Sequence, residues 1–194
     1  VIEEQREEAQ AMTSNQSASK VEQMLIQAVV RDGDKIIFRN VKDDNSGKIV
    51  NVTVAQYIAC DLGNDNLSFS NELYTRILHE AVEHSGEENF KAEEYFTQHP
   101  DINIASVAVR LSVDRFQLAE SLQVKETEQT LCDRVLHLVA DLRLEYVSSR
   151  LKELNTQLKQ VKDPKEMQEI IEEIMKIQSL RSSLAKKTGS NILA

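Results

Sequence analysis

Apolar residues recur at helical spacing along most of the chain. Between residues 20 and 31 the apolar positions are three and four apart, Ser19 stands three residues before Glu22, and Gly33 follows the last turn. A Ser or Thr three residues ahead of Glu or Gln is typical of a capping box, in which each side chain binds the other residue's backbone N–H group. The pattern therefore predicts a helix over residues 20–31.

One segment departs from this spacing. β-Branched residues and Phe38 stand on both sides of Asn45, Ser46 and Gly47. Such runs around a turn sequence indicate a β-hairpin, and we expect its strands at residues 35–41 and 48–52.

Short helical patterns follow the hairpin. Thr53 and Gln56 repeat the capping-box spacing and open a helix that we expect Gly63 to end. Three more are predicted, between Ser70 and Gly86, over residues 91–99 before Pro100, and over residues 102–112. We therefore expect a mainly α fold, in which residues 20–150 form a compact bundle of short helices with one small β-hairpin insertion.

The helical pattern lengthens between residues 126 and 161, where it predicts one helix of about 50 Å at 1.5 Å per residue. Apolar residues surround the first half, as expected of a helix that is buried on nearly all sides. The second half has one narrow stripe, formed by Leu151, Leu154, Leu158 and Val161. We expect the helix to begin inside the bundle and to protrude from it.

Pro164 interrupts the pattern. A proline in a helix interior costs about 3 kcal/mol, because it lacks the N–H group and clashes with the preceding turn, whereas it is favoured at the first helical position. Asp163 then falls at the N-cap and Glu166 at the third helical position, which predicts a capping box at a sharp turn. An apolar stripe resumes at Met167, so we expect residues 151–194 to form an antiparallel helical hairpin.

Composition agrees with a helical globular chain. Of the 194 residues, 41% are hydrophobic, and there are only 5 Gly and 2 Pro. No apolar run approaches the length of a membrane span and no basic-then-apolar leader is present, so we expect a soluble, cytoplasmic chain with no membrane contact. The missing initiator Met, and the lack of apolar periodicity in residues 1–19, predict a fragment that starts with a linker remnant.

Few residue patterns suggest chemistry. Cys60 and Cys132 have no CxxC partner, and His79 and His84 are five residues apart, so their imidazoles would point about 140° apart on a helix. No Gly-rich phosphate loop or GxSxG motif occurs. We expect no cofactor, no metal and no catalytic residue. The many carboxylates leave an all-helical enzyme with an acid–base pair as an alternative.

The net charge of −9 disfavours direct nucleic-acid binding, because affinity for nucleic acids comes mainly from neutralising phosphates. The negative charge lies before residue 151. Residues 151–194 hold eight Lys and Arg against six Asp and Glu.

The C-terminal hairpin is therefore the candidate interaction element. A lone helix pair is marginal in water, and an amphipathic helix in a groove is a recurring mode of recognition. The predicted partner-binding residues are Ile174, Ile177, Leu180, Arg181, Leu184, Lys186, Lys187, Ile192 and Leu193. Two alternatives stay open: the stripe is consumed inside the hairpin, or it pairs with a second copy of the chain.

The order of these features resembles the C-terminal, helicase-binding domain of bacterial DNA primase of the DnaG type, with the Bacteroides-like group as the nearest match. The resemblance covers the chain from about Lys20 onward. It is carried by "VEQMLIQAVVRDGDKIIF", by "TVAQYIACDLGNDNLSFSNELYTRIL", by "DINIASVAVRLS" and by the terminal helical pair. The β-hairpin with its polar "KDDNSGK" turn is longer than the family leads one to expect.

The resemblance implies a function without catalysis. In that family the short-helix bundle is similar to the N-terminal domain of the replicative hexameric helicase, and the terminal hairpin docks onto that helicase domain. The implied partner is a DnaB-type helicase, with single-stranded DNA-binding protein as a further candidate. The chain would tether primer synthesis to the replication fork, and the polymerase activity would belong to a separate catalytic domain.

Overall fold

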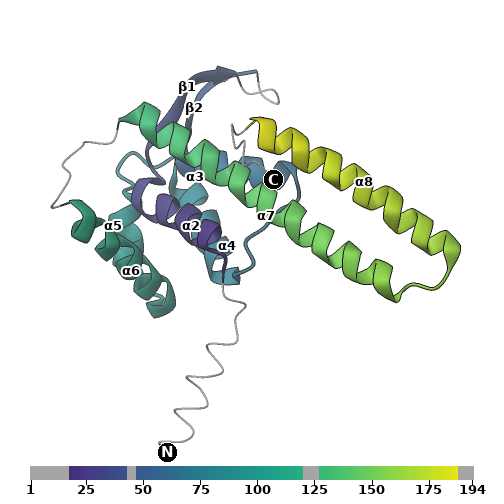
Figure 1. Ribbon diagram of the computed structural model, residues 1–194. Helices are drawn as coiled ribbons and strands as arrows, with labels where there is room; N and C mark the ends of the chain where they lie inside the picture. The colour runs from purple at the N-terminus through teal and green to yellow at the C-terminus, as the bar shows by residue number, and fades with distance from the viewer. Residues whose placement is uncertain (1–17, 43–46, 120–126, 188–194) are drawn as a thin grey trace, which may run out of the picture. The chain divides into compact units, whose positions relative to one another are not determined.

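A computed structural model describes residues 18–42, 47–119 and 127–187 of the chain. Over these ranges the protein is mainly helical with one two-stranded antiparallel sheet, which confirms the predicted fold class (Figure 1). The chain divides into two compact units, Val1–Val135 and Leu136–Ala194. The division falls inside the long helix, whereas the sequence pattern places a boundary after residue 150.

Helix α2 (Lys20–Asp32) is the centre of the first unit. It packs against α3 (Val54–Asn64), α4 (Glu72–His84), α5 (Ala92–Thr97) and α6 (Ile102–Ala119). Its fully buried side chains are Leu25, Ile26, Ala28, Val29 and Val30. Because these residues face four neighbouring helices, they supply the apolar burial that stabilises a bundle of short helices.

Two of the three predicted capping boxes are present. The amide of Glu22 donates to Ser19 Oγ at 3.1 Å, and the amide of Ser19 donates to Glu22 Oε2 at 3.3 Å. Thr53 and Gln56 make the same reciprocal pair at the start of α3. Residues spaced three apart can satisfy each other locally, which is why the sequence alone located these two helix starts.

The start of α4 differs from the prediction, because Ser70 has another partner. Its amide donates to Glu22 Oε1 at 2.7 Å and its hydroxyl donates to Glu22 Oε2 at 2.5 Å. Asn71 caps α4 instead, through an Oδ1 that accepts from the Leu73 amide at 2.9 Å. The helix therefore begins at Glu72, after the serine that the pattern indicated.

The β-hairpin lies within one residue of its predicted strands. β1 (Ile36–Lys42) and β2 (Ile49–Thr53) are antiparallel, with Ile36 opposite Thr53 and Lys42 opposite Ile49. Phe38 reaches α3, where its ring centre lies 5.4 Å from that of Tyr57. The predicted turn residues Asn45 and Ser46 lie outside the described residues.

Helix α6 is longer than predicted and extends to Ala119. Its start is fixed by Asp101, whose Oδ1 accepts from the Asn103 amide at 2.9 Å and whose Oδ2 accepts from Arg76 at 3.0 Å. The backbone hydrogen bond from Asn103, followed by the hydrogen bond from Arg76, lowers the pKa of the Asp101 carboxyl below its ordinary value. Asp101 thus links α4 to the N-terminus of α6.

We expect Asp101→Asn to flatten the acid end of the stability profile. The folded-state pKa of Asp101 is below the ordinary value of 3.8, so its stabilisation is complete above that pH and is lost as pH falls through the folded value. Urea unfolding of both proteins between neutral pH and pH 3 checks this. The variant should be less stable than wild type at neutral pH and should lose less stability on acidification. If the stability of the two proteins fell in parallel as the pH is lowered, the stabilising role of the Asp101 carboxylate would be contradicted.

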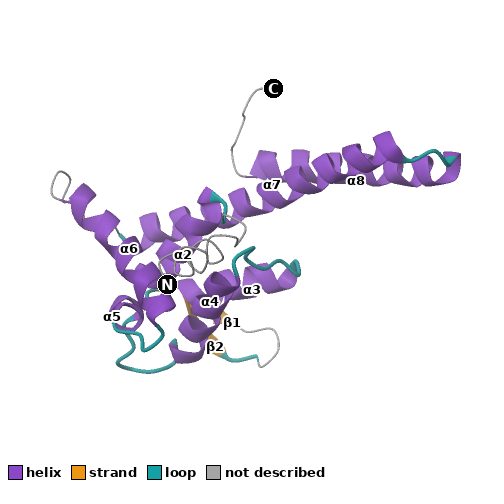
Figure 2. Cartoon of the chain, turned by 90° about the horizontal axis from the view of Figure 1, so that it is seen from below, coloured by secondary structure: helices purple, strands orange, loops and turns teal. Residues whose placement is uncertain are grey.

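The long helix α7 (Glu128–Gln160) begins in the first unit, where Leu131, Cys132 and Val135 are buried. There Arg134 donates to Asp32 at 2.9 Å, and Lys35 donates to the same buried carboxylate at 2.6 Å. Helix α8 (Pro164–Lys187) returns alongside the second half of α7 (Figure 1, Figure 2). Among the helices that the structure describes, none has an apolar stretch that could cross a membrane.

Candidate interaction site

The second unit contains the helical hairpin that α7 and α8 form. Helix α7 ends at Gln160 and α8 begins at Pro164, as the proline position predicts. The amide of Met167 donates to the Asp163 carbonyl at 3.0 Å, which makes this the first helical hydrogen bond of α8. The chain therefore reverses over three residues.

The predicted capping box at this turn is not formed. The side chains of Asp163 and Glu166 are both exposed, and within residues 127–187 neither makes a hydrogen bond. An exposed helix terminus can leave its first amides to water, and an acidic side chain still interacts favourably with the positive end of the helix dipole. The proline, rather than a cap, fixes the start of α8.

A short apolar seam holds the two helices together. Its buried members are Leu151 and Leu154 of α7 and Ile170 and Ile174 of α8, with Val147, Leu158, Val161 and Ile177 packed around them. Leu154 is the most deeply buried of them, at 1% exposed. The stripe predicted for α7 is therefore used inside the hairpin, together with part of the stripe of α8.

One ion pair marks a side of the hairpin next to this seam. Arg150 donates to Glu173 Oε1 from Nη2 at 2.8 Å and from Nε at 3.1 Å. The hydrogen bond and the charge of Glu173 raise the pKa of the Arg150 guanidinium. Both side chains are more than two-fifths exposed, so the pair orients the helices rather than adding much stability.

The predicted partner-binding residues occupy different environments. Ile174 is buried in the seam, and Ile177 is half-buried against it. Leu184 is half-buried as well, whereas Leu180 is 51% exposed and Arg181 and Lys186 are exposed. Lys187 is the last residue of α8. Ile192 and Leu193 lie outside the described residues, so their role stays a prediction.

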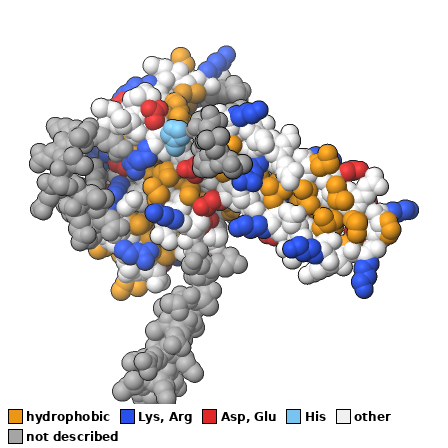
Figure 3. Space-filling view, viewed as in Figure 1, with side chains coloured by type: hydrophobic (Ala, Val, Ile, Leu, Met, Phe, Trp, Pro, Cys, Tyr) orange, Lys and Arg blue, Asp and Glu red, His pale blue; other side chains and the backbone are white. Residues whose placement is uncertain are grey.

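The structure exposes apolar residues that the sequence analysis did not name as partner-binding. Met167, Ile171 and Met175 of α8 are 36%, 41% and 64% exposed. The space-filling view shows apolar side chains gathered along the hairpin, with Lys and Arg around them (Figure 3). The spacing of four residues between Met167, Ile171 and Met175 is visible in the sequence. Only the packing of α8 on α7 separates them from the seam residues next to them.

An open cleft of about 650 Å³ lies near the turn. It is lined by Gln157, Gln160, Val161, Lys162, Glu166 and Ile170. Gln157 and Glu166 belong to the side of the hairpin that also holds the Arg150–Glu173 pair, because helical spacing places them there. Two of its lining residues are apolar and four are polar or charged, and they do not include a nucleophile beside a base.

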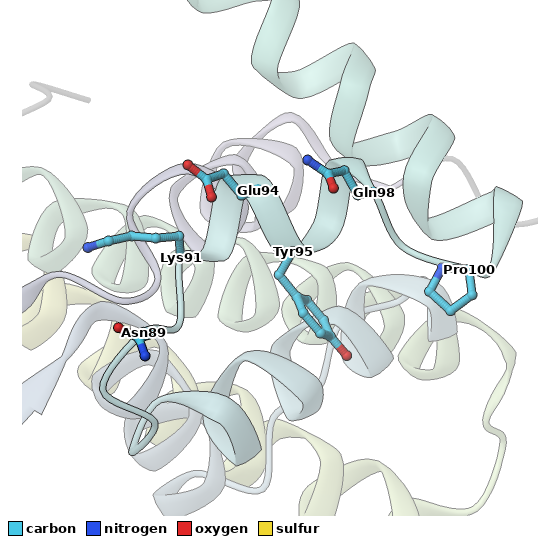
Figure 4. Close-up of a pocket in the computed structure, with 6 residues that line it drawn as sticks. All are labelled: Asn89, Lys91, Glu94, Tyr95, Gln98 and Pro100. Atoms are coloured by element: carbon cyan, nitrogen blue, oxygen red, sulfur yellow. The ribbon is translucent and has the colours of Figure 1, made fainter.

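A second open cleft, of about 340 Å³, lies in the first unit. Figure 4 shows Tyr95 between Asn89 on one side and Pro100 on the other, with Lys91, Glu94 and Gln98 completing the lining. Burial, and then the charge of Glu80, raises the pKa of the Tyr95 hydroxyl, which lies 3.5 Å from a Glu80 oxygen. A tyrosine with a raised pKa stays protonated and can donate a hydrogen bond, but it is not a nucleophile.

Residues 79–84, "HEAVEH", contain two side chains that make polar and aromatic contacts with nearby residues of the first unit. Glu80 is 2.9 Å from His99 Nε2, and His84 Nδ1 is 2.7 Å from Glu87. His84 also lies against Phe90 and Tyr95. Over the residues that the structure describes, no three His, Cys, Asp or Glu side chains are grouped so that they could hold a metal ion.

Comparison with known proteins gives one result. No curated protein and no solved structure matches the chain. One family model does match, and it covers residues 5–192, which is nearly the whole chain. The chain therefore belongs to the family described as a domain of unknown function, DUF8430.

Proposed function

We propose that this chain is a non-catalytic interaction module of a bacterial DNA primase, and that its C-terminal hairpin binds the N-terminal domain of the replicative DnaB-type helicase. The module would hold the separate catalytic domain of the primase at the replication fork. Such tethering raises the local concentration of the linked activity without any new catalytic contact. Single-stranded DNA-binding protein is a further candidate partner.

One observation carries this proposal most directly. The hairpin is a compact unit whose seam is already complete, yet the neighbouring side chains of Ile171 and Met175 of α8 remain 41% and 64% exposed. Apolar side chains gathered on a surface mark a site of protein–protein contact more often than isolated ones do. The order of short-helix bundle, long helix and terminal hairpin agrees with the resemblance to the primase domain.

The same exposed side chains also fit the alternative of self-association, in which two hairpins pair. Sedimentation velocity of the chain alone separates the two functions. A monomer across the concentration range would favour the helicase partner. A concentration-dependent dimer that does not bind helicase would favour self-association.

We expect deletion of residues 151–194 to abolish binding to the helicase N-terminal domain, because the truncation removes α8 and all four buried residues of the seam. Calorimetric titration of the full chain and of the truncated chain checks this. Thermal unfolding of the truncated chain is the control, since a cooperative transition shows that the first unit remains folded. Undiminished binding after truncation, or no binding by the full chain, would refute the proposed function.

A further inference from the structure

We infer that the hairpin docks through one particular face, and that the partner presents there an apolar helix flanked by carboxylates. The face consists of Met167, Ile171 and Met175 of α8, with Lys152 and Lys159 of α7 along its edge. From here on, the stripe means these three residues of α8. This inference deepens the proposed function and rests on it. None of the three α8 side chains was named by the sequence analysis as a contact.

Helical geometry separates the stripe from the seam. At 100° per residue, Met167, Ile171 and Met175 cover about 80° of the circumference of α8, beginning about 60° from the direction of the seam residues. Glu173 lies about 60° from the seam in the opposite sense, and its contact with Arg150 fixes which side of the hairpin that is. The stripe therefore occupies the other side.

The band of α8 that contains the stripe is uncharged over a considerable length. Gln178 and Ser182 continue the same band, so it holds no charged residue from Pro164 to Ser182, about 27 Å at 1.5 Å per residue. Glu169, Glu173 and Lys176 all fall outside it. An uncharged band of this length matches the contact that one helix makes when it lies along another.

Positive charge borders the stripe on the α7 side. Lys152 and Lys159 are exposed, and helical spacing places them on the same side of the hairpin as the stripe, whereas Glu153 points to the other side. Within the part of the chain that the structure describes, neither lysine has an ion-pair partner.

The unpaired lysines decide between the possible occupants. A symmetric contact between two copies would bring the same face, and so the same positive rim, against itself. Like charges at an interface disfavour association, whereas opposite charges steer and orient it. The face therefore fits a different protein, whose apolar helix carries Asp or Glu along its edges. Two of the three stripe residues are methionines, whose flexible side chains adapt to such a surface.

The test compares matched exposed positions on the two sides of α8. Met175→Glu and Ile171→Glu should each weaken binding of the full chain to the helicase N-terminal domain at least tenfold, because each buries a charge that the partner's carboxylates repel. Ser183→Glu is the control. The Ser183 side chain is exposed and lies about 80° beyond Met175 around α8, outside the stripe, so the affinity of this variant should stay within about twofold of wild type. Circular dichroism verifies that all three variants keep their helices.

The charge of the partner is tested separately. Replacing Lys152 and Lys159 together by Glu should slow association at least tenfold at low salt, with a smaller effect at high salt, because rim charges act mainly on encounter and are screened. Lys176→Glu is the matched control, since Lys176 lies away from the stripe, and should change the rate little.

The outcomes distinguish this inference from the proposed function. Failure of the wild-type chain to bind helicase overturns both. Normal binding by the Met175 and Ile171 variants, with wild type bound, overturns the inference alone. Faster association after charge reversal would show a basic partner surface, and would also overturn it.

Discussion

Leu154→Ala is expected to melt the hairpin. Leu154 is 1% exposed and stands in a seam of only four buried residues, so no second layer can fill the space that its side chain leaves. Replacing a buried leucine by alanine costs about 2 to 5 kcal/mol, through lost apolar burial and an unfilled cavity. We therefore expect hydrogen exchange of amides in residues 147–177 to accelerate by about two orders of magnitude or more.

Met175→Ala provides the matched control. It removes a side chain of similar size from the same hairpin, but one that is 64% exposed, so exchange in this unit should change little. If the two variants exchanged alike, the seam would not be the element that holds the hairpin together. Exchange at Leu25 and Ile26 in the first unit reports whether the effect stays local.

Glu22→Ala is expected to have the largest effect in the first unit. The Glu22 carboxylate is 3% exposed and accepts hydrogen bonds from the Ser70 amide, the Ser70 hydroxyl and the Ser19 amide. Removing it leaves these donors without their charged acceptor, and each such hydrogen bond contributes roughly 1.5 to 3 kcal/mol. Because these contributions are not additive, we expect a total loss of about 3 kcal/mol in the free energy of unfolding.

Two companion variants separate the local cap from the long-range contact. Ser19→Ala removes only the cap of α2 and should cost about 1 kcal/mol. Glu22→Gln keeps one acceptor oxygen, so its loss in the free energy of unfolding should lie between those of the other two variants. Denaturant unfolding measures all three. Equal losses for Ser19→Ala and Glu22→Ala would mean that the contact with Ser70 contributes nothing.

The fold class was accessible from the sequence because its signals are local. Capping boxes at Ser19 and Thr53, the strand pattern around Gly47 and the position of Pro164 each involve residues a few positions apart, and all four elements begin within one residue of where these signals place them. Interactions over such short separations are largely independent of how the elements pack.

Local signals failed where a distant residue competes for the same group. Ser70 resembles a helix cap, but Glu22, which is 48 residues earlier in the chain, takes both its amide and its hydroxyl. The capping box expected of Asp163 and Glu166 is absent for the opposite reason. The side chains of residues 162–166 are exposed, so the polar groups of that turn reach water and need no protein partner.

The sequence by itself determined that the chain ends in two amphipathic helices with a sharp turn between them. Only the tertiary structure decided how the apolar residues of α8 are divided: Ile170 and Ile174 are buried in the seam, and Met167, Ile171 and Met175 are left at the surface. The buried and the exposed positions differ by about 20° to 140° around one helix, and either set could face a neighbour. The choice depends on which residues of α7 lie opposite, and helical periodicity does not contain that information.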